Sequence, residues 1–500
     1  MSKNSTALRI RMYRHGLGDC FLLTFVREGR DDFNMMIDCG LLQGTANGTQ
    51  IMKTVVEDVE ATLGVSRKGD EDEEEKKWLD AVVLTHEHAD HTSGFSQARE
   101  VFDRIHFGEV WAGWTEDKGH PKYKAVRERF HKQVTGLRAA LERMNSEEQQ
   151  GLRETVRDLV YDFFEEDVLG AKEKGSDRPT AWEYALGKSV NPPRYCRPGE
   201  SFLLEGFDDV RVYVLGPPEQ FETFTKVDPP PDETYRAEGN KFAMADSFFA
   251  AVAGDGELFD GELYQPFERH LRIDAESEAP HDDFFETHYG FGDGGEDGWR
   301  RIGDDWLTMA GGLALNLDSY TNNTCLAFAI EFVDSGKVLL FPGDAQFANW
   351  ISWQKLSWRV PDGKGGRRTV TTEDLLRRTV FYKVGHHGSH NATLKQHGLE
   401  MMTHPDLAAM IPVDTKKAKS KTSKTNPEGW EMPEKKLFTR LKEKTRGRVI
   451  LADEKDDAKL KTRCQDKKFL KSVVFLGEFV RDENTSPKKE PLCIQLTVEG

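Results

Sequence analysis

The sequence lacks long apolar runs and has few cysteines. No stretch of about 18 consecutive apolar residues, the length that a membrane-spanning helix needs, occurs among its 500 residues. The opening MSKNSTALRIRMYRHG contains no apolar segment of the kind that a secretory signal requires. The 6 cysteines form no C-x-x-C pair, which argues against a zinc ribbon or a disulfide framework. We therefore expect a cytoplasmic protein without membrane contact, whose thiols are reduced and buried.

Positive charge is scarce overall but concentrated in one region. The chain has 69 Lys and Arg against 86 Asp and Glu, a net charge of −17 that disfavours polyanionic partners. Between residues 217 and 315 the balance is 7 − 23 = −16, whereas between 411 and 472 it is 19 − 10 = +9. Such asymmetry can mark a nucleic-acid-binding face, although solvated lysine-rich helices give the same composition.

Strand-like apolar runs bounded by turn residues occur in two groups along the chain. Helical sequence follows each group, and histidines or aspartates stand directly after several of the runs. This order predicts an α/β fold, an αββα sandwich of two mixed β-sheets flanked by helices. The runs cover 8–14, 20–26, 34–37, 79–85, 202–204, 210–215, 324–332, 338–341, 380–384, 472–480 and 492–498.

Three segments interrupt this pattern. Residues 117–190 carry apolar positions at helical spacing and are predicted to form a helical insertion. Residues 219–315 are acidic and rich in Gly, Pro and Asp, and we assign no secondary structure to this second insertion. Residues 411–472 form a basic C-terminal segment within the fold. We predict a single domain over 1–500 that contains all three.

The most informative motif is THEHADH at 85–91, which begins at the last residue of the apolar run LDAVVLT. Its three imidazoles and one carboxylate are costly to bury without a partner. They are also ligands that zinc, manganese and iron prefer. On a loop, His86 and His88 can direct two nitrogens at one ion, and Asp90 and His91 can reach a second. The alternative is a polar loop that is merely rich in histidine.

Two further motifs follow apolar strands in the second half of the chain. In FPGDA at 341–345, Asp344 follows a tight Pro-Gly turn and is placed to bridge two cations. In KVGHHGSH at 383–390, His386 and His387 are candidate ligands. Each motif alone is weak, because Gly-Asp turns are common and a His-Gly-Ser loop can be a capping turn.

Together the three motifs resemble the metallo-β-lactamase superfamily. Within it, the sequence is most similar to the hydrolase domain of bacterial DNA-uptake (competence) proteins, and the secreted phosphorylcholine esterases share the histidine pair. The likeness covers most of the chain outside the insertions. The segments that carry it are HGLGDCFLL, MIDCG, THEHADHTSG, VLGPP, SYTNNTCLAF, LLFPGDA and KVGHHGSHNAT.

The resemblance implies a two-metal site that holds two zinc ions, with manganese as the alternative. Two such cations lower the pKa of a shared water molecule, which Asp90 would orient. Asp38 matches the family's aspartate that orients the histidine loop. His386 would face the substrate and stabilise charge on a phosphoryl oxygen, unless it is only a structural histidine of the turn. The implied ligands are His86 and His88 for the first ion, Asp90, His91 and His387 for the second, and Asp344 as the bridge.

One ligand of the family is missing. Many members have a further histidine that completes the first metal site, but the equivalent strand end here reads EVWAGWT at 109–115. Water, Glu116 or His120 could fill this place, or the first ion binds weakly. His270, His281 and His288 fall in the acidic insertion.

We therefore expect a metal-dependent hydrolase, foremost a phosphodiesterase or nuclease. Its partner would be a phosphoester substrate, with nucleic acid favoured by the basic segment and disfavoured by the acidic insertion. Hydrolysis of carboxylic esters, lactones or thioesters is an alternative, because one fold supports several chemistries. A third reading is a subunit that docks protein partners through its insertions.

Overall fold

The computed structural model describes most of the chain, in ten segments. Within the chain, two compact units are distinguished, and each is described by itself. The first unit comprises Met1–Val126, Tyr161–Asn240 and Ser319–Gly500, and the second comprises Arg127–Val160 and Lys241–Asp318. The described residues are 5–64, 77–144, 150–163, 179–220, 229–230, 232–235, 310–362, 365–422, 427–481 and 488–500.

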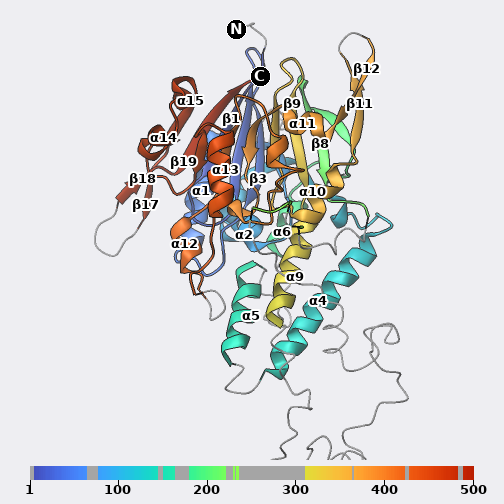
Figure 1. Ribbon diagram of the computed structural model, residues 1–500, viewed down its shortest axis with the longest axis vertical. Helices are drawn as coiled ribbons and strands as arrows, with labels where there is room; N and C mark the ends of the chain where they lie inside the picture. The colour runs from blue at the N-terminus through green and yellow to red at the C-terminus, as the bar shows by residue number, and fades with distance from the viewer. Residues whose placement is uncertain are drawn as a thin grey trace, which may run out of the picture. The chain divides into compact units, whose positions relative to one another are not determined.

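An eight-stranded mixed sheet forms one half of the first unit (Figure 1). Its central strands β1, β2 and β3 are antiparallel neighbours, whereas β4, β5 and β6 continue in parallel from β3. In spatial order the strands are β16 (Val473–Leu476), β19 (Cys493–Glu499), β1 (Ala7–Tyr13), β2 (Cys20–Val26), β3 (Phe33–Cys39), β4 (Lys77–Val83), β5 (Ile105–Gly113) and β6 (Arg194–Cys196).

A seven-stranded mixed sheet forms the other half. Strands β10, β13, β14 and β15 run parallel, and β7, β8 and β9 extend the sheet in antiparallel fashion. In spatial order the strands are β15 (Val449–Leu451), β14 (Ala408–Ile411), β13 (Thr379–Lys383), β10 (Val338–Phe341), β9 (Ala327–Phe332), β8 (Phe207–Gly216) and β7 (Ser201–Leu204).

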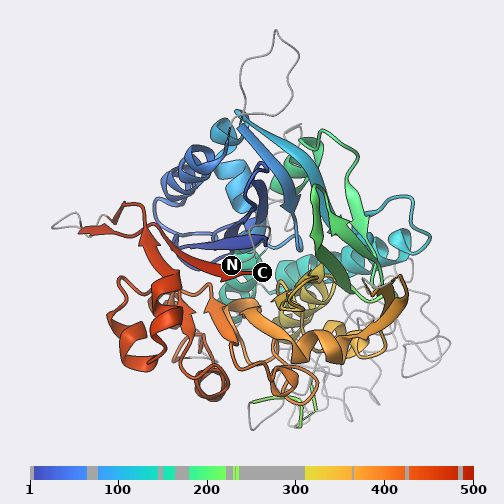
Figure 2. The same ribbon diagram turned by 90° about the horizontal axis from the view of Figure 1, so that it is seen from above.

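The two sheets face each other across one apolar core (Figure 2). Ile10 and Val83 of the first sheet and Phe341 and Phe381 of the second belong to this same buried cluster. Strand β2 is buried along nearly its whole length, because helices cover its other face. This explains why CFLLTFV is a continuous apolar run rather than an alternating one.

Helices cover the outer faces of both sheets. Against the first sheet, α1 (Gly48–Thr62), α2 (Ala89–Gln97), α3 (Arg99–Phe102) and α6 (Ala181–Gly187) contribute to a second buried apolar cluster. Against the second sheet, α10 (Phe347–Trp353) contacts β8 and α11 (Thr372–Arg377) contacts β10. The predicted αββα sandwich of two mixed sheets is therefore confirmed. A small hairpin, β11 (Ser357–Pro361) with β12 (Arg367–Thr371), and the pair β17 (Phe479–Arg481) with β18 (Lys488–Glu490) complete the strands of the described residues.

The interrupting segments contain additional helices. The region predicted as a helical insertion contains α4 (Tyr123–Arg143), α5 (Gln150–Phe163) and α6, and the short helix η1 (Trp114–Glu116) directly precedes it. Most of the acidic insertion lies outside the described residues, and α9 (Ala310–Asn323) begins within its last part. The basic segment carries most of its lysines on the short helices α12 (Thr415–Ser420), α13 (Lys435–Lys444), α14 (Ala458–Arg463) and α15 (Lys467–Ser472).

Where the chain is described, none of its helices combines the length and the apolar character needed to cross a bilayer.

Candidate metal centre

The histidine loop lies between the end of β4 and the first turn of α2. His86 and His88 belong to the loop, whereas Asp90 and His91 belong to the helix, whose hydrogen bonds set their directions. The hydroxyl of Thr92 donates to the carbonyl oxygen of His88 (3.0 Å) and ties the loop to the helix. All four predicted ligands in this motif are buried.

Asp38 fastens this loop to the neighbouring strand. At the end of β3 it adopts a left-handed backbone conformation (φ 54°) and is fully buried. Its Oδ1 accepts the backbone N–H of Thr85 (2.8 Å), and its Oδ2 accepts the Thr85 hydroxyl (2.7 Å) and Nδ1 of His91 (2.8 Å). Because Nδ1 of His91 donates to Asp38, Nε2 keeps its lone pair for a cation. This is the position expected for the residue that orients the loop.

His86 and His88 converge on one another. Nε2 of His86 lies 2.9 Å from Nδ1 of His88. Nδ1 of His86 lies 3.0 Å from the Thr85 hydroxyl, which can accept its proton because that hydroxyl donates to Asp38. The imidazole ring of His86 also packs 4.2 Å from that of His91, centroid to centroid. The two predicted ligands of the first ion therefore lie beside the ligands of the second.

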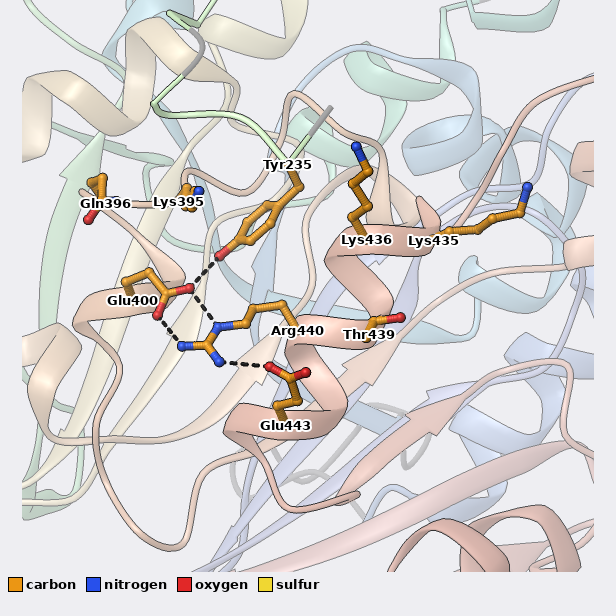
Figure 3. Close-up of a pocket in the computed structure, with 9 residues that line it drawn as sticks. All are labelled: Tyr235, Lys395, Gln396, Glu400, Lys435, Lys436, Thr439, Arg440 and Glu443. Atoms are coloured by element: carbon orange, nitrogen blue, oxygen red, sulfur yellow. Dashed lines mark hydrogen bonds and ion pairs between the residues drawn. The ribbon is translucent and has the colours of Figure 1, made fainter. Parts of the chain in front are cut away.

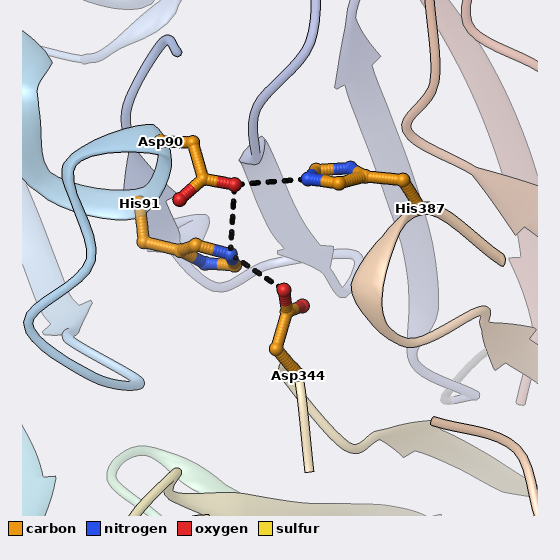
Figure 4. Close-up of side chains that lie close together, drawn as sticks. All are labelled: Asp90, His91, Asp344 and His387. Atoms are coloured by element: carbon orange, nitrogen blue, oxygen red, sulfur yellow. Dashed lines mark hydrogen bonds and ion pairs between the residues drawn. The ribbon is translucent and has the colours of Figure 1, made fainter. Parts of the chain in front are cut away.

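Four side chains from three separate segments meet at the second predicted position (Figure 4). Asp90 and His91 come from α2, Asp344 follows β10, and His387 follows β13. Nε2 of His387 lies 2.9 Å from Oδ2 of Asp90, and Nε2 of His91 lies 3.1 Å from Oδ2 of Asp344. One ligand atom from each residue falls within 4.8 Å of all the others.

This arrangement fits a divalent cation of the zinc type. Ligand atoms held at about 2.0–2.2 Å from one tetrahedral ion lie roughly 3–3.5 Å apart, which is close to the spacings observed here. Oδ1 of Asp90 is buried and has no hydrogen-bond partner in the described part of the chain. Such a buried carboxylate oxygen is costly unless a cation or solvent satisfies it.

The site also concentrates opposite charges. Burial disfavours the charged form of Asp90, but His91 and His387 outweigh this effect and lower its pKa to about 2. Burial likewise disfavours protonation of His91, but the carboxylates of Asp344 and Asp90 hold its pKa well above the usual value. An environment that stabilises a proton on His91 so strongly also favours a cation at the same place.

The loop after β13 presents His386 and His387 in unusual backbone conformations. Both have positive φ values, 44° and 53°. Nδ1 of His387 donates to the carbonyl oxygen of Pro412 (2.6 Å), so its Nε2 points toward Asp90. The backbone N–H of His386 donates to Oδ1 of Asp344 (2.9 Å). Its imidazole is buried beside the cluster, and a role toward the substrate stays a prediction.

Three residues at the site were not predicted from the sequence. Asp19 and Lys383 form an ion pair within the cluster, and Lys383 also lies 3.2 Å from Asp344. Cys325 accepts the backbone N–H of Asp344 on its sulfur (3.2 Å), and burial raises the pKa of its thiol to about 12. The charge of Lys383 at the end of the apolar strand TVFYK is a signal that could have identified it.

The missing third ligand of the first ion is not evident in the structure. His120 packs on the ring of Trp114 at 4.4 Å, and Nδ1 of His120 accepts the backbone N–H of Lys122. Neither His120 nor Glu116 belongs to a ligand cluster in the described part of the chain. His270, His281 and His288 lie outside the described residues.

Residues 15–172 match the family model of the metallo-beta-lactamase superfamily. The comparison with curated proteins found no match to the chain. The matched part contains Asp38 and the histidine loop, whereas Asp344 and His387 lie beyond it. This segment is thus similar to the metallo-beta-lactamase superfamily, a superfamily of metal-dependent hydrolases, and the His/Asp cluster offers a place for a metal.

Proposed function

We propose that this protein is a phosphodiesterase that uses a metal-activated water molecule and acts on nucleic acid. The observation that carries the proposal is the buried meeting of Asp90, His91, Asp344 and His387. His86 and His88 lie next to this cluster and are the proposed ligands of another ion. Nitrogen and oxygen donors of this kind favour zinc, with manganese as the alternative.

The residues at such a site would have different roles. Bound cations would supply Lewis acidity, which lowers the pKa of water and neutralises charge on phosphate oxygens. Asp90, whose Oδ1 takes no hydrogen bond from the described residues, is placed to orient the attacking solvent. Asp38 fixes the direction of His91. His386 is the candidate for stabilising charge on the phosphoryl oxygen or protonating the leaving oxygen.

Phosphoester and carboxylic ester substrates can be separated directly. The paired His386 and His387 favour phosphoesters, as does the likeness of the motifs to the DNA-uptake hydrolases. We expect the zinc- or manganese-loaded protein to hydrolyse bis(p-nitrophenyl) phosphate at least about 100-fold faster than p-nitrophenyl acetate, a difference of about 2.7 kcal/mol in activation free energy. Both reactions release the same chromophore and can be compared by absorbance. Faster cleavage of the acetate would favour the carboxylic ester alternative.

A groove lined by more basic than acidic side chains supports nucleic acid as the substrate class (Figure 3). The cavity has a volume of about 700 Å³ and is lined by Lys395, Lys436 and Arg440 of the second-sheet half, among others. Arg440 is already paired with carboxylates, but Lys395 and Lys436 carry no ion pair that would neutralise them in the described residues. Glu434 precedes the groove residue Lys435 in the chain, and its backbone N–H donates to the carbonyl oxygen of Gly388, the residue after His387 (2.9 Å).

Comparing an oligonucleotide with a small diester tests whether this groove binds the substrate. Because each phosphate contact adds a salt-dependent term, we expect Lys395→Glu with Lys436→Glu to weaken oligonucleotide binding at least about 10-fold at low salt and to flatten its salt dependence. Cleavage of the small chromogenic diester should be unchanged. Lys459→Glu, which changes an exposed lysine of α14 that does not line the groove, is the control. An equal loss of oligonucleotide affinity in the groove variant and in the control would indicate a general charge effect rather than binding in the groove.

Docking of protein partners through the insertions stays a prediction. It is compatible with hydrolysis, and a protein that holds its metals but cleaves no member of the substrate panel would favour it.

A further inference from the structure

Lys383 places a positive charge inside the metal centre. It is the last residue of β13 and only 2% exposed. Its Nζ donates to the carbonyl oxygen of Gly343 (3.0 Å) and to Oδ1 of Asp344 (3.2 Å), and it forms an ion pair with Oδ2 of Asp19. An ammonium group has three protons to donate. All three have acceptors here, so the direction of this side chain is fully determined.

The bond from Lys383 determines which oxygen Asp344 offers to a metal. Oδ1 of Asp344 accepts from Nζ of Lys383 and from the backbone N–H of His386 (2.9 Å). Oδ2 lies instead 3.1 Å from Nε2 of His91. The carboxylate is therefore held at one oxygen and presents the other toward the ligand cluster.

Asp19 holds the ammonium group in this position. Its backbone is fixed between two parts of the first sheet half, because its N–H donates to the carbonyl oxygen of Asp90 (2.9 Å) and its carbonyl oxygen accepts from Gly40 (3.0 Å). The side chain of Asp19 is 1% exposed and reaches Lys383 from there. The ion pair thus connects the segment that carries Asp90 with the segments that carry Asp344 and His387.

We infer that Lys383 is a positioning residue that presents Oδ2 of Asp344 to the metals, with Asp19 as the anchor of its ammonium group. The inference rests on the metal centre of the proposed function but not on the identity of the substrate. A rival explanation is that the ion pair only joins the two halves of the fold. In that case removal of the ion pair would lower the stability of the fold, and zinc affinity would fall and recover together with stability.

Three variants separate these explanations. Lys383→Met leaves the carboxylate of Asp19 buried without its cation, which is strongly destabilising. The double variant Lys383→Met/Asp19→Asn removes both charges and is expected to recover much of the lost stability. Lys337→Met serves as the matched control, because it removes a lysine just before β10 whose Nζ donates to the backbone carbonyl oxygen of Glu499 (2.7 Å).

The measurements are zinc affinity, by competition with a chromophoric chelator, and the thermal unfolding midpoint of the metal-free protein. We expect zinc affinity to fall about 10- to 100-fold in the double variant although its unfolding midpoint recovers, as when an outer partner of a metal ligand is removed. Zinc affinity that recovers together with stability would overturn the inference, and so would a wild-type protein that binds no zinc. Zinc binding by the wild type without diester cleavage would refute only the proposed phosphodiesterase activity.

Discussion

Asp90→Ala is expected to lower diester hydrolysis by at least about 10³-fold, a loss of about 4 kcal/mol in transition-state stabilisation. One carboxylate oxygen of Asp90 lies 2.9 Å from Nε2 of His387, and the other is free of hydrogen bonds from the described residues. The substitution therefore removes a metal ligand and the group that orients the attacking solvent together. Initial rates on bis(p-nitrophenyl) phosphate, measured with metal content on the same sample, test the expectation.

Two further variants make this result specific. His387→Ala removes the partner from the opposite loop and should reduce turnover by a similar factor. Glu87→Ala changes a partly buried carboxylate of the same loop that belongs to no ligand cluster in the described residues, and we expect turnover within about twofold of wild type. Unchanged turnover in folded Asp90→Ala or His387→Ala would remove the mechanism proposed here.

Gly40→Ala is expected to disable the site without changing any ligand. A Cβ atom on Gly40 would lie 2.3 Å from both the carbonyl carbon of Asp90 and the backbone nitrogen of His91. These are backbone atoms of a helix, so they cannot relieve the clash by a change of rotamer, as a flexible side chain could. Relief of the clash requires α2 to move away from β3, which displaces two ligands at once. Overpacking of this kind costs about 3 kcal/mol or more.

The measurement is urea unfolding of the metal-free protein together with zinc affinity. We expect the unfolding free energy to fall by about 3 kcal/mol and zinc affinity to fall with it. Gly64→Ala is the control, because a Cβ there meets no atom within 4 Å. A Gly40→Ala protein with wild-type stability and zinc affinity would show that the contact between Gly40 and α2 is not needed.

The histidine loop could be proposed from the sequence because its residues are nearly consecutive. His86, His88, Asp90 and His91 carry their spacing in the printed order of the chain, and the apolar strand before them locates the loop at a sheet edge. Asp344 and His387 could be added only through the motifs of a known family. That these loops meet is a property of the sheet order, in which β10 and β13 are parallel neighbours.

Other features of the fold and of the site could not be predicted from the sequence. Strands β14 and β15 span only four and three residues, too few to show an alternating pattern. The pair of Asp19 and Lys383 joins positions far apart in the sequence, so the charge of Lys383 at the end of an apolar strand marks an unusual residue but does not identify its partner. Sequence order alone cannot show which distant charges become neighbours, because tertiary packing decides it.

The position of β19 has a consequence for how the protein is made. This strand pairs with β1 on one side and with β16 on the other, so β1 waits for a partner that is synthesised after every proposed ligand. Until residues 493–499 emerge, β1 presents an open row of backbone hydrogen-bonding groups. A nascent chain that already carries every proposed ligand therefore still lacks the strand that closes its first sheet. Loading with metal is accordingly expected to follow the synthesis of β19.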